Sequence, residues 1–180
     1  GITLAQVVRP RTPVVYGAFT TNADMKTGSP AFGTPEYALA TQASGQLARR
    51  YNVPFRSSNT TSANCVDAQA ACESALSLWA AVGGHANIIV HAAGWLEGGL
   101  TASYEKLIVD AEMLQAFAEY LRPIEVTPET IALEAIIEAG PGGHFFGVGH
   151  TLARFQTAFY QPLLSDRQNF EAWNSAGAED

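Results

Sequence analysis

Short β-prone runs alternate with longer segments of helical character along most of this sequence. The β-prone runs cover residues 14–19, 53–57 and 87–92, and apolar residues recur at helical spacing between and after them. Because strands joined by a helical crossover pair in parallel, the alternation predicts a parallel α/β sheet. The third run is apolar at consecutive positions, which predicts a fully buried strand. Since three or four strands are too few to close a barrel of eight, an α/β layer and half of a (β/α)8 barrel both remain open.

Residues with a preference for helix N-termini mark where the expected helices begin. A threonine precedes a proline at two of these starts, and a serine precedes the longest helical segment. In the expected capping box of that segment, Lys106 stands where glutamate is typical, so the box is incomplete. We expect helices over residues 35–51, 67–82, 103–121 and 127–138, with Thr34, Ser103 and Thr127 as N-caps.

Length and composition bound the class of protein. The 180 residues predict a single domain over 1–180 that reads as part of a longer polypeptide, with no signal peptide. A net charge of −7 argues against a nucleic-acid partner. No apolar run is long enough to span a bilayer, so we expect no membrane segment. Cys65 and Cys72 would lie about 10.5 Å apart along one helix, beyond disulfide reach, which favours the cytoplasm.

A glycine-rich loop over residues 140–152 carries two histidines. Glycines recur through it too densely for a regular helix or strand, and a helix is expected to start near His150 and continue through Phe159. The loop either presents His144 and His150 at the wall of a cleft or forms a tight turn that the histidines hold together. We favour a functional role for His144 and a structural role at the helix start for His150.

In parallel α/β folds the functional residues lie just beyond the carboxyl ends of the strands. Polar and aromatic side chains follow each of the three expected strands, and we expect them to converge on one edge of the sheet together with the histidines of the glycine-rich loop. They are Asn22, Asp24 and Lys26 after the first strand, Ser58, Asn59, Thr60 and Asn64 after the second, and His91, Trp95 and Glu97 after the third.

Two other kinds of chemistry have weaker support. His91, His144 and His150 could join a carboxylate around zinc, but neither the H-E-x-x-H nor the C-x-x-C spacing is present. The G-x-S-x-G elbow of α/β hydrolases is also missing from the sequence. A zinc-dependent α/β hydrolase therefore stays only as an alternative.

Several short sequence pieces are weak singly and specific in combination, and they cover nearly the whole chain. The pieces are 13–17, 24–28, 67–70, 91–99, 103–106, Asp110, 142–147, 150–152, Pro162, 166–167 and Trp173. Together they resemble the trimethylamine methyltransferase family of corrinoid-dependent enzymes.

The resemblance implies a fold and an activity. Members of this family are (β/α)8 proteins, so the chain resembles the C-terminal half of such a barrel. The family moves a methyl group from an amine to the Co(I) of a corrinoid (cobalamin) carried by a separate partner protein, so no cofactor would bind this chain directly. The trimethylamine enzymes carry pyrrolysine, which is not written in this sequence. The resemblance therefore points to the branch without pyrrolysine, which includes glycine betaine methyltransferases.

A quaternary amine is a fixed cation that cannot donate hydrogen bonds, so aromatic faces and a carboxylate should form its site. Aromatic residues near the expected strand ends supply such faces, although packing in the core would explain them as well. We assign catalytic roles to His144, His91 and Glu97, and substrate binding to Tyr16, Phe19, Asp24, Asn64, Trp95, Tyr104 and His150.

Unpaired strand edges predict a homo-oligomer, or helices that cap the edges. The chain by itself is expected to have little methyltransferase activity. The main alternative is a non-catalytic half barrel that binds a cationic osmolyte or a partner protein.

Overall fold

The computed structural model describes residues 1–17 and 19–177. These residues belong to two compact units, Gly1–Leu114 and Gln115–Asp180, and each is described by itself. The single domain over residues 1–180 remains a prediction.

A parallel sheet forms the centre of the first unit. Its strands are β1 (Tyr16–Gly17), β2 (Phe55–Ser58) and β3 (Ile88–Val90), in the order β1-β2-β3. Helix α2 (Pro35–Arg50) connects the first two strands, and α3 (Ala68–Gly83) connects the second and third. The predicted parallel α/β arrangement is confirmed for these three strands.

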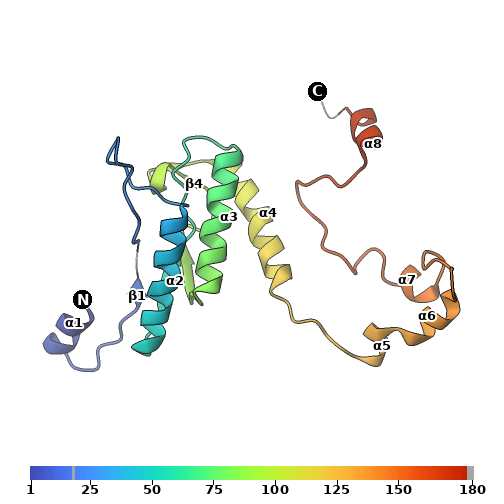
Figure 1. Ribbon diagram of the computed structural model, residues 1–180, viewed down its shortest axis with the longest axis horizontal. Helices are drawn as coiled ribbons and strands as arrows, with labels where there is room; N and C mark the ends of the chain where they lie inside the picture. The colour runs from blue at the N-terminus through green and yellow to red at the C-terminus, as the bar shows by residue number, and fades with distance from the viewer. Residues whose placement is uncertain (18, 178–180) are drawn as a thin grey trace. The chain divides into compact units, whose positions relative to one another are not determined.

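The helices α2 and α3 lie side by side and both contact β2 (Figure 1). The predicted N-cap of α2 is confirmed, because the Thr34 hydroxyl accepts a hydrogen bond from the Tyr37 N–H at 3.3 Å. Tyr37 is fully buried, and its hydroxyl donates to the backbone carbonyl of Ser58 at 3.0 Å. This contact ties the first turn of α2 to the carboxyl end of β2.

A short hairpin follows the parallel sheet and was not predicted. Strands β4 (Trp95–Leu96) and β5 (Thr101–Ala102) pair antiparallel around the 3₁₀ turn η1 (Glu97–Gly99). The long helix α4 (Tyr104–Tyr120) comes next. Its predicted N-cap is confirmed, because the Ser103 hydroxyl accepts from the Lys106 N–H at 3.1 Å. A first helix, α1 (Ile2–Val8), precedes β1 and was also not predicted.

The prediction of a fully buried third strand is wrong. Within β3, Ile88 is 49% exposed and the next two residues are half-buried. The strand is exposed because of its place in the sheet. Among the described residues β3 pairs only with β2, so it forms an edge of the sheet. A run of apolar residues predicts burial only where both faces of the sheet are covered.

After the end of α4, residues 121–177 of the second unit form four short helices. They are α5 (Pro128–Ile131), α6 (Leu133–Ala139), α7 (Gly149–Leu152) and α8 (Phe170–Ser175).

Two helix predictions need correction in this unit. The helix expected over 127–138 is split at Ala132, whose φ of 52° is left-handed and stops a right-handed helix. The helix expected from His150 through Phe159 begins as predicted but ends at Leu152. Phe155 and Phe159 are exposed, so no packed apolar face supports a longer helix there.

Among the described residues, no helix combines the length and the apolar character that crossing a membrane requires.

Candidate functional site

The carboxyl ends of β2 and β3 meet at one edge of the sheet. Ser58 ends β2 and His91 follows the last residue of β3. The Ser58 hydroxyl lies 3.1 Å from His91 Nδ1 and 2.6 Å from the Thr60 hydroxyl. A hydrogen bond to one ring nitrogen fixes the orientation of an imidazole. The neighbouring strand therefore orients the predicted catalytic residue His91.

Four rings form an aromatic cluster at this edge, composed of Phe19, Phe32, His91 and Trp95. Ring centres are 5.4 Å apart for Phe19 and His91, and 5.7 Å apart for His91 and Trp95. Phe32 meets Phe19 edge to face at 6.1 Å. The rings come from the segments that follow β1 and β3, so the sheet brings together residues far apart in the sequence. These spacings are typical of favourable aromatic pairs.

An acidic groove of about 750 Å³ lies beside the aromatic cluster and shares Phe32 with it. Three carboxylates line it, those of Asp24, Glu73 and Glu97. Among the described residues that line the groove, none is Lys or Arg. The groove therefore favours a cationic ligand electrostatically.

Asp24 is held in a tight turn at the rim of the acidic groove. Its carboxylate accepts hydrogen bonds from the Thr27 hydroxyl at 2.7 Å and the Lys26 N–H at 3.1 Å. These two bonds, the first being the stronger influence, hold the pKa of Asp24 below its usual value. Asp24 therefore keeps its negative charge at neutral pH.

The other two carboxylates of the groove are also fixed by hydrogen bonds. Glu73 Oε2 accepts from the Thr61 hydroxyl at 2.6 Å and from the Ser62 N–H at 2.7 Å. Glu97 Oε2 accepts from the Thr101 hydroxyl at 2.7 Å across the β4–β5 hairpin. Glu73 was not among the predicted site residues, because a glutamate within an alanine-rich helix carries no signal of its own in the sequence.

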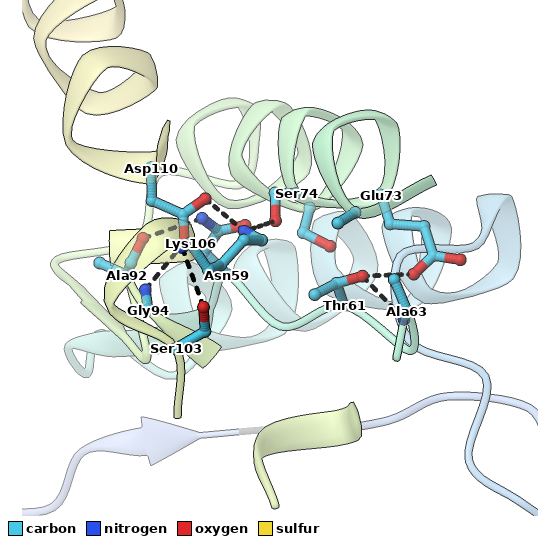
Figure 2. A network of polar contacts seen from close by, with 12 residues as sticks. Asn59, Thr61, Ala63, Glu73, Ser74, Ala92, Gly94, Ser103, Lys106 and Asp110 are labelled. Atoms are coloured by element: carbon cyan, nitrogen blue, oxygen red, sulfur yellow. Dashed lines mark hydrogen bonds and ion pairs between the residues drawn. The ribbon is translucent and has the colours of Figure 1, made fainter. Parts of the chain in front are cut away.

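A buried ion pair between Lys106 and Asp110 supports this part of the molecule (Figure 2). Each residue is only 1% exposed, and Lys106 Nζ also donates to the Ser74 hydroxyl on α3 at 2.8 Å. The second oxygen of Asp110 accepts from the backbone N–H of Gly94 at 2.9 Å. The pair thus links α4 to α3 and to the loop after β3.

The segment from His91 to Gly99 has an unusual backbone. Positive φ occurs at two non-glycine residues in it, His91 at 50° and Glu97 at 53°, as well as at three glycines. Such backbone persists only where surrounding contacts fix it, and it concentrates at functional sites. The contact of Gly94 with Asp110 is one such restraint. The strained backbone therefore coincides with two of the predicted catalytic residues.

The structure brings together six of the ten predicted site residues. Phe19, His91 and Trp95 belong to the aromatic cluster. Asp24, Asn64 and Glu97 line the acidic groove.

Two predicted binding residues lie elsewhere in the first unit. Tyr16 lines a different pocket, of about 520 Å³, with Leu47 and Tyr51 from the end of α2. Tyr104 is the first residue of α4 and is 85% exposed. Both were chosen for their proximity in sequence to expected strand ends, which does not fix the direction of a side chain.

His144 and His150 belong to the second unit. His144 is exposed, with its ring centre 5.9 Å from that of Phe146. His150 Nε2 lies 3.2 Å from the backbone oxygen of Glu129, and the imidazole lines a pocket of about 530 Å³ beside α5 and α6. His150 thus connects α7 with α5, while the functional roles of both histidines remain predictions.

Within residues 1–17 and 19–177, no group of three or more His, Cys, Asp or Glu side chains comes together in a way that could hold a metal ion.

Comparison with known proteins decides the family. The model of the trimethylamine methyltransferase family matches residues 1–180. This chain belongs to the trimethylamine methyltransferase family. The resemblance carried by the short sequence pieces is thereby confirmed.

Individual members of the trimethylamine methyltransferase family show graded similarity. A glycine betaine methyltransferase of Desulfitobacterium hafniense (strain Y51) is 41% identical over 174 residues, which cover 96% of this chain and 36% of the relative. A trimethylamine methyltransferase of the same species (strain DCB-2) is 35% identical over 180 residues, 99% of this chain and 36% of the relative. One of Methanosarcina acetivorans is 34% identical over 183 residues, 100% of this chain and 36% of the relative. The chain spans about 36% of the length of these curated relatives.

Proposed function

We propose that this chain is part of a methyltransferase that moves a methyl group from a quaternary or tertiary amine, such as a betaine, to the Co(I) of a corrinoid protein. The observation that carries the proposal is the family match over residues 1–180, with a glycine betaine methyltransferase among the relatives at 41% identity. Relatives named trimethylamine methyltransferases stand at 34% and 35% identity in the comparison above. This difference supports a betaine-like substrate.

The candidate site supports an amine substrate on chemical grounds. A quaternary ammonium is attracted to aromatic faces, and the aromatic cluster offers the Trp95 and Phe19 rings beside His91. The adjoining groove adds the carboxylates of Asp24 and Glu97. These residues would bind and orient the amine, with His91 and Glu97 nearest to the reacting methyl group.

The methyl acceptor in this proposal is a corrinoid carried by a separate protein, so the chain itself holds no cofactor. The task of its residues is to present the methylated nitrogen to the partner. A catalytic role for His144 belongs to the same proposal. The three parallel strands then form part of a (β/α)8 barrel, of which this chain supplies half. A cytoplasmic location and a homo-oligomeric state belong to the same proposal.

A binding titration tests whether the candidate site recognises methylated amines. Isothermal titration of the full-length protein with glycine betaine, and with trimethylamine, should give saturable binding of at least one amine. Replacement of Trp95 by leucine should weaken that binding, because leucine fills part of the space but presents no π face. Replacement of Trp79, an exposed tryptophan on α3, by leucine is the matched control and should leave affinity unchanged. The absence of binding for all methylated amines would contradict the proposal.

A non-catalytic amine-binding module would pass the same titration, because the aromatic cluster and acidic groove could hold an ammonium without any transfer. Only a measurement of methyl transfer separates that alternative from the proposed enzyme.

A further inference from the structure

One cationic side chain lies directly against the aromatic cluster. The guanidinium carbon of Arg56 lies 4.6 Å from the centre of the Phe19 ring. Arg56 is in β2 between Phe55 and Ser57, both of which are buried. Because successive side chains of a strand point to opposite faces, Arg56 leaves the sheet on the face opposite to these two neighbours. The guanidinium therefore belongs to the face on which Phe19 lies.

The guanidinium of Arg56 has no hydrogen-bond acceptor among the described residues. Within the part of the chain that the structure describes, Arg56 donates no hydrogen bond, and the ion pairs join other residues. The side chain is half-buried, yet no carboxylate of residues 1–17 or 19–177 accepts from its five N–H donors. Charged groups removed from water are normally paired. This cation is thus available to an anionic group that is not part of the described chain.

A glycine on the neighbouring strand gives Arg56 its path to the aromatic cluster. Gly17 pairs with Arg56 in the β1–β2 register. A Cβ atom at position 17 would lie 3.0 Å from Arg56 Cδ, closer than ordinary van der Waals contact, and 3.4 Å from Arg56 Nη1. The missing side chain at Gly17 therefore lets Arg56 cross β1 and reach Phe19.

We propose that Arg56 binds a carboxylate of the substrate, so that the substrate class is a methylated amine that also carries a carboxylate. This inference rests on the proposed function and deepens it. The planar guanidinium matches a carboxylate with two parallel hydrogen bonds. The ammonium end of such a zwitterion would lie at the free faces of the aromatic cluster and towards the acidic groove.

Charge also argues against a simple methylamine at this site. An ammonium ion placed in the aromatic cluster without a carboxylate would face the uncompensated guanidinium of Arg56. Like charges brought close together in a partly desolvated site repel one another. A substrate carboxylate removes this repulsion and supplies the acceptor that Arg56 lacks.

Paired titrations of the full-length protein test the assignment. The two probes are glycine betaine, which has a carboxylate, and tetramethylammonium, which has the cation alone. Replacing Arg56 by glutamine should weaken glycine betaine binding about 10- to 100-fold, the usual effect of losing hydrogen bonds to a charged group. Tetramethylammonium binding should stay within about threefold or strengthen, because the repulsive charge is gone.

Three further variants keep the test decisive. Arg56→Lys retains the charge but loses the bidentate geometry, so it should give an intermediate loss for glycine betaine alone. Gly17→Ala should shift Arg56 and also weaken only glycine betaine. Arg50→Gln is the matched control, since Arg50 is exposed on α2 and donates no hydrogen bond to a described residue. This variant should leave both affinities unchanged.

The outcomes are separable. If Arg56→Gln loses affinity equally for both probes, or for neither, the role of Arg56 is overturned. If Arg56→Gln fails to fold, the same outcomes in Arg56→Lys and Gly17→Ala overturn it. If the unsubstituted protein binds neither probe, the proposed function itself is overturned, and this assignment with it.

Discussion

The backbone N–H of Gly94 donates a hydrogen bond of 2.9 Å to the Asp110 carboxylate, which is itself paired with Lys106 (Figure 2). Gly94 has a φ of 83°, a conformation that side-chain-bearing residues rarely adopt. Asp110 therefore restrains the loop between His91 and Trp95. The two residues of this contact are 16 positions apart, and no sequence pattern predicts it.

The Lys106–Asp110 pair should show strong energetic coupling. Lys106→Met or Asp110→Asn alone leaves a buried charge without its partner, and each should lower the free energy of unfolding by about 3–5 kcal/mol. The double variant removes both charges while the asparagine still offers an oxygen to Gly94. Its loss should be clearly smaller than the sum of the two single losses. Chemical denaturation of the full-length protein measures the cycle, and simple additivity would contradict a functional pairing of the two charges.

Loss of the Asp110 carboxylate should also reach the aromatic cluster. Asp110→Ala removes the acceptor of the Gly94 N–H, and the loop that carries Trp95 should become more mobile. In a background in which every tryptophan except Trp95 is replaced by phenylalanine, Trp95 fluorescence should report the change. Glu119→Ala on the exposed part of α4 is the control. An unchanged Trp95 signal in Asp110→Ala would show that the carboxylate does not position the loop.

The Cys65 thiol should be slow to react at mildly alkaline pH. Its Sγ donates to Asp67 Oδ2 at 3.3 Å, and this hydrogen bond together with the negative charge of Asp67 raises the pKa of Cys65. In a background in which every cysteine except Cys65 is replaced by serine, Asp67→Asn removes the charge and keeps a residue suited to the N-cap, so the pKa of Cys65 should fall. Iodoacetamide alkylation followed against pH should then have its midpoint at lower pH. If Asp67→Asn leaves the profile of alkylation against pH unchanged, Asp67 does not raise the pKa of Cys65.

The same Asp67 makes helix α3 sensitive to acid. Its carboxylate accepts from the Ala70 N–H at 2.9 Å, and this bond, with a smaller contribution from Cys65, lowers the pKa of Asp67. A lowered pKa in the folded state gives stability that is present above the unfolded pKa of about 3.9 and is lost as pH falls through the folded value. Melting temperatures of Asp67→Asn should therefore decline less between neutral pH and pH 3 than those of the unsubstituted protein. Equal declines of the melting temperature in the two proteins would contradict the role of the Asp67 carboxylate.

The histidines of the glycine-rich loop call for a paired measurement of melting temperature and methyl-transfer rate. His144→Ala should slow transfer with little change in melting temperature, because the exposed ring makes no described hydrogen bond. His150→Ala should lower the melting temperature, because it removes the contact with Glu129. An unchanged rate in His144→Ala would remove that residue from the catalytic group.

Gly143→Ala supplies a control for the same loop. A Cβ at position 143 would lie 1.9 Å from the Ala139 carbonyl oxygen, so alanine should harm both stability and rate. Gly143 is not among the glycines with a positive φ, so close approach of the backbone is the reason for glycine here. A Gly143→Ala protein with unchanged melting temperature would contradict that close approach.

The sequence predicted the parts of the fold that depend on interactions between residues close together in the chain. Thr34 and Ser103 cap helices as expected, since a side-chain oxygen before an apolar repeat acts within one turn. The parallel pairing of β1, β2 and β3 followed from the length of their connections. The convergence of His91, Trp95 and Glu97 on the segment that follows the first strand was expected from the same topology.

Features that depend on distant contacts were not predictable in this way. Lys106 and Asp110 have the i,i+4 spacing of an ordinary surface pair, and only their packing against Ser74 and Gly94 buries them. The exposure of Tyr104 and the separate pocket of Tyr16 likewise depend on side-chain direction. Arg56 was overlooked because a single arginine in a strand has no signature until Gly17 and Phe19 are placed beside it.

Methyl transfer itself is the most direct measurement of the central claim. Full-length protein, glycine betaine labelled in its methyl groups and a corrinoid protein reduced to Co(I) would be mixed, and the label on the corrinoid followed with time. The account predicts label on the corrinoid at a rate that depends on glycine betaine and falls in Trp95→Leu but not in Trp79→Leu. Saturable binding of glycine betaine with no label on the corrinoid would contradict the proposed enzyme and leave an amine-binding protein.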